Sequence, residues 1–117
     1  MVSIENKSGR ISIPDDVFTN LAGEAATSCF GVKGMVSCAN DGAYWQLLRR
    51  ESMAKGVKLH TNDDGSVVVE LHIAIDQGVN IPAVGTSIQN EVIYKLGQLT
   101  GITVERVDVY IDTIMND

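Results

Sequence analysis

Cysteine, proline and long apolar runs are all scarce in this sequence of 117 residues. Its two cysteines are too few for a disulfide framework, so we expect reduced thiols that pack as small apolar groups. No stretch approaches the roughly 18 consecutive apolar residues of a membrane-spanning helix. The N-terminus also lacks the basic and apolar segments of a secretory signal. We therefore expect one cytoplasmic domain over residues 1–117, flexible over residues 1–8, without direct membrane insertion.

Basic residues are also in the minority. The formal net charge of −6 makes nucleic acid an unlikely partner. Residues 33–58 nevertheless carry five basic and two acidic residues, whereas residues 59–117 carry two basic and nine acidic residues. This asymmetry predicts weak, salt-sensitive association with another copy or with a charged partner, and scattered solvated charge is the alternative. The basic candidates for this interaction are Lys33, Arg49, Arg50, Lys55 and Lys58.

The first half of the chain predicts a strand followed by a helix. Residues 9–13 alternate between polar and apolar side chains, which favours a short strand. Pro14 and two acidic residues then suit a helix start, and apolar residues recur at helical spacing from Val17 to about Phe30. We expect a flexible turn at residues 31–34 and a second, shorter helix over residues 44–54.

A β-hairpin is predicted next, around turn residues 61–65. It would place His60 opposite about Val67, and His72 opposite about Lys55. One face of its long second strand is apolar, and the other carries Glu70, His72 and Asp76. The residues expected to face the core are Val67, Val69, Leu71, Ile73 and Ile75.

The last third predicts a helix and a final strand. Pro82 suits the first helical turn, and Gly101 suits a left-handed stop. Glu105 and Arg106 interrupt the alternation of the last strand, which indicates a bulge or a new start near Val107. The buried helical stripe should contain Val84, Ile88, Val92 and Leu96, extended by Ile81 and Leu99. The predicted fold is α+β, a small mixed sheet with helices packed on one face, in the order β-α-(α)-β-β-α-β.

We find no recognisable catalytic or cofactor site. The predicted hairpin separates His60 from His72 by about five positions, too far to share a metal ion. Residues 85–87 lack the second glycine of a nucleophile elbow. Neither Cys29 nor Cys38 has a base placed beside it by sequence. We expect no metal, no cofactor and no enzymatic activity; a small enzyme with an unrecognised site is one alternative.

Two features suggest binding. Polar residues of the long strand and of the last strand can point outward together, although a solvated sheet face is the simpler interpretation. Gly31 and Gly34 bracket Lys33 in a Gly-x-x-Gly segment after a helix, which is similar to a KH-type RNA-binding domain. RNA binding through this loop is a second alternative. The candidate residues of the outward-pointing patch are Glu70, His72, Asp108 and Tyr110.

Six short segments form a pattern through their order and spacing: residues 9–13, 31–35, 55–59, 69–75, 100–104 and 107–111. This pattern resembles the alkaline-shock or envelope-stress protein family of Gram-positive bacteria, in particular a small housekeeping-type member. Two departures, Gln77 and Asp108, stand where the family often has tyrosine and asparagine. The resemblance implies a non-enzymatic protein of envelope homeostasis and stress response that self-assembles. It also implies a partner anchored in the membrane, which holds the protein at the inner face of the membrane.

Overall fold

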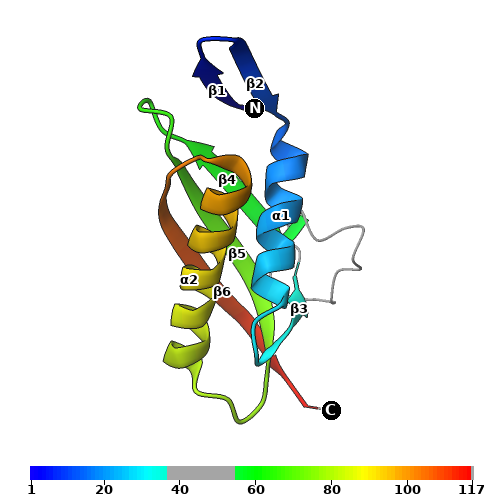
Figure 1. The fold of residues 1–117 in the computed structure, drawn as a ribbon. Coiled ribbons are helices and arrows are strands. Elements are labelled where there is room, and N and C mark those ends of the chain that lie inside the picture. The colour runs from blue at the N-terminus through cyan, green and yellow to red at the C-terminus, as the bar shows by residue number, and fades with distance from the viewer. Residues whose placement is uncertain (37–54, 117) are drawn as a thin grey trace.

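The described part of the chain folds into two helices and six strands (Figure 1). This computed structural model describes residues 1–36 and 55–116. The α+β class and the mixed sheet are as predicted, whereas the helix predicted over residues 44–54 lies outside the described residues. The elements are β1 (Val2–Asn6), β2 (Gly9–Ile13), α1 (Asp15–Thr27), β3 (Val32–Met35), β4 (Val57–Thr61), β5 (Val67–Asp76), α2 (Ile81–Thr100) and β6 (Val104–Met115).

Strand β5 is the centre of the main sheet. One edge of β5 pairs antiparallel with β4 along its first half and with β3 along its second half. The other edge pairs parallel with β6. His60 lies opposite Val68, one residue from the predicted partner. The predicted pairing of His72 with Lys55 is wrong, because β4 begins at Val57 opposite Leu71 and the His72 carbonyl accepts from the Val36 amide instead.

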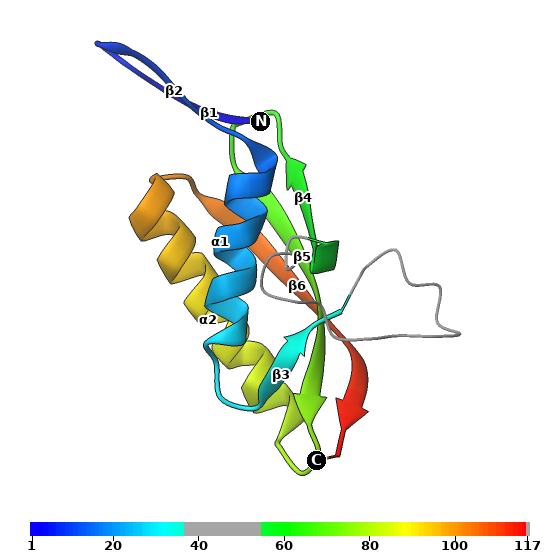
Figure 2. The same ribbon diagram turned by 90° about the vertical axis from the view of Figure 1, so that its right-hand side faces the viewer.

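Both helices cover the same face of this sheet, as predicted (Figure 2). Beneath them, all five predicted inward residues of β5 are completely buried, because they alternate with the polar positions of the strand. The predicted bulge in β6 is also present. Val67 and Val68 pair with Val104 and Arg106, which leaves Glu105 without an opposite residue.

Helix α2 buries one stripe of side chains at four-residue spacing. Its start is fixed by Asn80, whose side chain accepts from the Ala83 amide at 3.0 Å, and its end by Gly101 in the left-handed conformation. The predicted extension of the stripe is wrong, because Ile81 is 42% and Leu99 is 63% exposed. The buried side chains are Val84, Ile88, Val92, Leu96 and Thr100.

Helix α1 contacts the core through part of the predicted apolar pattern. Val17 is 46% exposed, whereas Phe18 is fully buried. Small residues, including Ala22 and Ala26, continue this buried face. They allow α1 to lie close to α2 and to the sheet.

Residues 1–8, for which the sequence predicts flexibility, contain strand β1, which forms a hairpin with β2. β1 and β2 form a separate two-stranded sheet that projects from the body of the molecule (Figures 1 and 2). Val2 is only 2% exposed within the core, and the amino group of Met1 lies 2.6 Å from Asp15. These contacts with distant residues hold the base of the hairpin, and the local sequence does not reveal them.

Strand β3 corrects the expected flexible turn at residues 31–34. Gly31 ends the connection after α1 with a φ of 89°, close to Val79 and Val84, and β3 follows directly. The Asp76 amide donates to the Gly31 carbonyl at 2.8 Å. Met35 is fully buried. Pairing with β5 therefore makes a strand of a segment whose glycines suggested a loop.

Candidate binding face of the sheet

The sheet has a second face, turned away from α1 and α2, which we call the outer face. The strand register brings three of its polar residues into one row, with Glu70 between Lys58 and Asp108. The next row pairs His72 with Tyr110. All four residues of the predicted outward-pointing patch therefore lie side by side. The polar residues of the outer face are Lys58, His60, Glu70, His72, Arg106, Asp108, Tyr110 and Asp112.

His72 is held on three sides. Its Nε2 lies 2.9 Å from Oε2 of Glu70, and its Nδ1 lies 2.9 Å from Oδ2 of Asp112. Its ring stacks on Tyr110, with centroids 4.9 Å apart and planes inclined by 8°. The His72 side chain is only 16% exposed. Each ring nitrogen of His72 lies within hydrogen-bonding distance of one carboxylate oxygen.

This geometry fixes the imidazole and leaves neither ring nitrogen free. Glu70 and Asp112 bind opposite sides of the ring, so their carboxylates do not converge on a common point. Within residues 1–36 and 55–116 there is no group of three or more histidine, cysteine, aspartate or glutamate side chains suited to a metal ion. His60 lies four positions from His72 along β5, or about 13 Å at the rise of a strand.

The rest of the outer face carries charge and one accessible aromatic ring, and the apolar residues of β5 on this side are buried. Arg106 Nε lies 3.1 Å from a carboxylate oxygen of Asp108. Val68 and Ala74 of β5 are buried, whereas Tyr110 of the neighbouring strand β6 is 47% exposed. An ordered polar centre with an accessible aromatic ring is a surface suited to binding another molecule.

The predicted basic candidates are dispersed among the elements. Lys58 lies on the outer face, whereas Lys33 of β3 pairs with Asp76 at 3.4 Å. Lys55 is exposed just before β4. Arg49 and Arg50 lie outside the described residues.

The Gly-x-x-Gly segment has no loop geometry. Lys33 and Gly34 belong to β3, and Gly34 pairs with Ala74 of β5. A KH-type clamp needs an exposed loop. The RNA-binding alternative thereby loses the feature on which it was based.

Sequence reasoning missed Asp112 as a partner of His72. Its position two residues after Tyr110 places it on the same side of β6, and this alternation was available in the sequence. Its contact with His72 depends on the register shift between the Ile73–Ile111 and Ala74–Thr113 pairs, which only the structure reveals.

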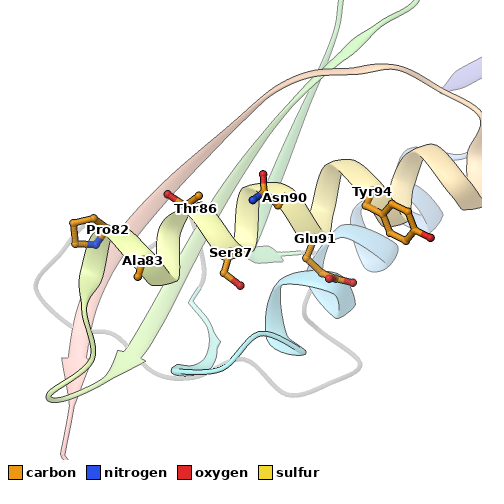
Figure 3. Close-up of a pocket in the computed structure, with 7 residues that line it drawn as sticks. All are labelled: Pro82, Ala83, Thr86, Ser87, Asn90, Glu91 and Tyr94. Carbon is orange, nitrogen blue, oxygen red and sulfur yellow. The ribbon is translucent and has the colours of Figure 1, made fainter.

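A shallow groove runs along the exposed side of α2 (Figure 3). Thr86 and Ser87 belong to a helix here, so no strand-to-helix turn presents them as a nucleophile. The nearby Cys29 thiol has a pKa above its usual value because burial disfavours the thiolate; the Ser87 hydroxyl partly opposes this, and the Glu91 charge adds to it. The lining residues are Pro82, Ala83, Thr86, Ser87, Asn90, Glu91 and Tyr94.

Comparisons with known proteins give a consistent family. The model of the alkaline shock protein 23 family, described as having a cell envelope-related function, matches residues 3–116. The uncharacterised protein Spy1614 of Streptococcus pyogenes serotype M6 is 38% identical over 114 residues, covering 97% of this chain and 93% of the relative. The uncharacterised protein YloU of Bacillus subtilis is 29% identical and covers 97% and 94% of the two chains. A second Bacillus subtilis relative, the uncharacterised protein YqhY, is 28% identical, with 93% and 79% covered.

No solved structure matches the chain. Among the described residues, neither helix has the length and apolar character needed to cross a membrane.

Proposed function

Because the chain belongs to the alkaline shock protein 23 family, whose function is described as cell envelope-related, we propose that it is a non-catalytic binding and assembly module of the cell envelope. The outer face is its binding surface. The observation that carries the proposal is the fixed position of His72 between Glu70 and Asp112, against the ring of Tyr110. His72 lies on the outer face, whereas the five inward aliphatic residues of β5 lie on the opposite face, in the core.

Fixed side chains favour binding for an entropic reason. A flexible surface residue costs about 0.5–1.5 kcal/mol when a partner immobilises it. The His72 and Tyr110 rings are already held against each other in the free protein, so this cost is reduced. Tyrosine is also among the residues that most often dominate an interface, and the exposed edge of Tyr110 is accessible to a partner.

The charge of the outer face indicates the chemistry of the partner. Three acids, Glu70, Asp108 and Asp112, outnumber the two cations of the same face. This surface is complementary to a segment rich in lysine and arginine. Cytoplasmic segments next to membrane-spanning helices have that composition. We therefore assign the protein to the cytoplasm, held at the inner face of the membrane by a membrane-anchored protein that carries such a segment.

A capture experiment with matched tyrosine variants tests this proposal. The tagged protein would be used to isolate partners from native cells with membranes retained. Each captured membrane protein would then be measured as a synthetic peptide of its basic cytoplasmic segment. We expect Tyr110→Ala to weaken peptide binding about 30-fold, the effect of a typical hot-spot residue. Tyr94→Ala removes a tyrosine of α2 that is 62% exposed, against 47% for Tyr110, and should leave binding unchanged.

Two results would contradict the proposal. Equal binding by the Tyr110 and Tyr94 variants would remove the outer face as the binding surface. Capture that never enriches a membrane protein with a basic cytoplasmic segment would remove the proposed partner.

A further inference from the structure

The outer edge of β6 is a second feature that points to association. Within residues 1–36 and 55–116, β5 is the only strand that pairs with β6, so β6 has one paired and one unpaired edge. β6 contains 12 residues, which makes this edge long. An unpaired strand edge is a template for another strand. We propose that two copies of the chain pair antiparallel along β6, about a two-fold axis at Val109; this inference rests on the proposed assembly function.

The backbone groups that face this edge can be identified. The Val67 amide donates to the Thr103 carbonyl, so Val67 and Val69 face β6. In a parallel ladder Val69 bonds to the neighbours of its partner Val107. The backbone groups of Val107 are thereby left on the free edge, where Gln89 Nε2 donates to the Val107 carbonyl at 3.0 Å. Backbone groups alternate in direction along a strand. Val109 and Ile111 therefore present their amides and carbonyls to the same free edge, ready to pair with a second strand.

Charge and the regular stretch of β6 together select the register. Residues opposite each other in an antiparallel pair lie on the same face. An axis at Val109 places Arg106 opposite Asp112 of the second copy, twice in each dimer. On the helix side, it places Val107 opposite Ile111 of the second copy. The first pair brings opposite charges together, and the second brings two apolar side chains together.

Neighbouring axes are less favourable. An axis at Asp108 places this carboxylate opposite its own copy, and an axis at Tyr110 places Asp108 opposite Asp112. Like charges in direct opposition are destabilising. An axis at Val107 also places Arg106 opposite Asp108 of the second copy, but the Glu105 bulge follows directly, so this axis is not centred on the regular stretch of β6 between the two register shifts. An axis at Ile111 brings no opposite charges together.

The resulting dimer has two consequences. It joins the two sheets into one continuous sheet with all helices on the same side, as a two-fold pairing of identical edges requires. It also places Tyr110 of one copy beside Asp108 of the other, so that the two outer faces become one larger binding surface. Self-association would therefore enlarge the surface to which we assign the partner.

Charge reversal with complementation tests the register. Arg106→Asp alone places acids opposite acids, and Asp112→Arg alone places cations opposite cations. We expect each single variant to associate about tenfold or more weakly than the natural chain in sedimentation velocity over a concentration series. An equal mixture of the two variants restores opposite charges across the pair, so we expect it to form a heterodimer.

The control variant is Lys58→Asp, which reverses a charge on the same face but on β4, at the opposite edge of the sheet. Circular dichroism would establish that every variant is folded. A natural chain that stays monomeric at all concentrations would overturn the proposal, as would a mixture that associates no better than its components. Neither result affects the capture of a membrane partner, which tests the proposed function separately.

A cysteine cross-link gives a second measurement that does not depend on charge. In a hydrogen-bonded antiparallel pair the opposite Cα atoms are about 5.5 Å apart, within the range of a disulfide. Val109→Cys, in a chain with Cys29 and Cys38 changed to serine, should therefore link to its own copy under mild oxidation. Ile111→Cys lies opposite Val107 and should not. Equal cross-linking of both variants would overturn the assigned register.

Discussion

The two faces of β5 differ in how strictly the fold determines them. On the helix side, five aliphatic side chains are completely buried and interchangeable in kind. On the outer face, His72 meets two particular carboxylates and one particular aromatic ring. An apolar core requires only hydrophobic side chains of suitable total volume, so many sequences can form it. The outer face requires specific groups at specific positions, and specificity of that kind is typical of function.

The largest effect is expected on the helix side. Leu71→Ala removes most of a fully buried side chain at the centre of β5 and leaves a cavity. We expect a loss of about 2–5 kcal/mol in the free energy of unfolding, measured by urea denaturation. A loss below about 1 kcal/mol would show that the helix side is loosely packed, and the contrast between the faces would then fail.

A smaller effect is expected on the outer face. His72→Ala removes two hydrogen bonds to carboxylates and a ring stack, and we expect a loss of about 1–2 kcal/mol in the free energy of unfolding. His60→Ala is the matched control, because His60 is an exposed histidine on the same face. If both variants unfold at the same urea concentration, the contacts of His72 contribute nothing to stability.

This contrast also explains what the sequence could predict. The inward residues of β5 and the stripe of α2 were found correctly, because burial on one face imposes a regular spacing. β1 and β3 were missed for the opposite reason. Val2 is buried by the tertiary core, and β3 is a strand because Met35 and Val32 pair along β5. Such long-range contacts leave no periodic signal in a segment of four or five residues.

The candidate site was predicted in part for a related reason. Alternation along β5 and β6 placed Glu70, His72, Asp108 and Tyr110 on one face, and the strand pairing confirms that placement. The same alternation does not predict which carboxylates lie within hydrogen-bonding distance of His72. Asp112 does so because of the irregular register near the end of β6.

The smallest effect concerns Cys29, on the helix side, where α1 ends beside α2. Its Sγ lies 3.6 Å from the Ala25 carbonyl, and the side chain is partly buried. Burial raises the pKa of the thiol, the Ser87 hydroxyl opposes this by hydrogen bonding, and the Glu91 charge raises it further. The thiolate is the reactive form. We therefore expect iodoacetamide to modify Cys29 several-fold more slowly in the folded Cys38→Ser chain than in the same chain in urea.

The dependence on pH follows from the direction of this shift. A thiol whose pKa is raised by folding contributes its full stability at neutral pH, and the contribution is lost as the pH rises through the alkaline range. Glu91→Gln should move the pH dependence of the alkylation rate to lower pH, and Ser87→Ala should move it to higher pH. Equal alkylation rates in the folded and unfolded chains would show that Cys29 is solvated. The buried region beneath the helices would then end before Cys29, in the connection that follows α1.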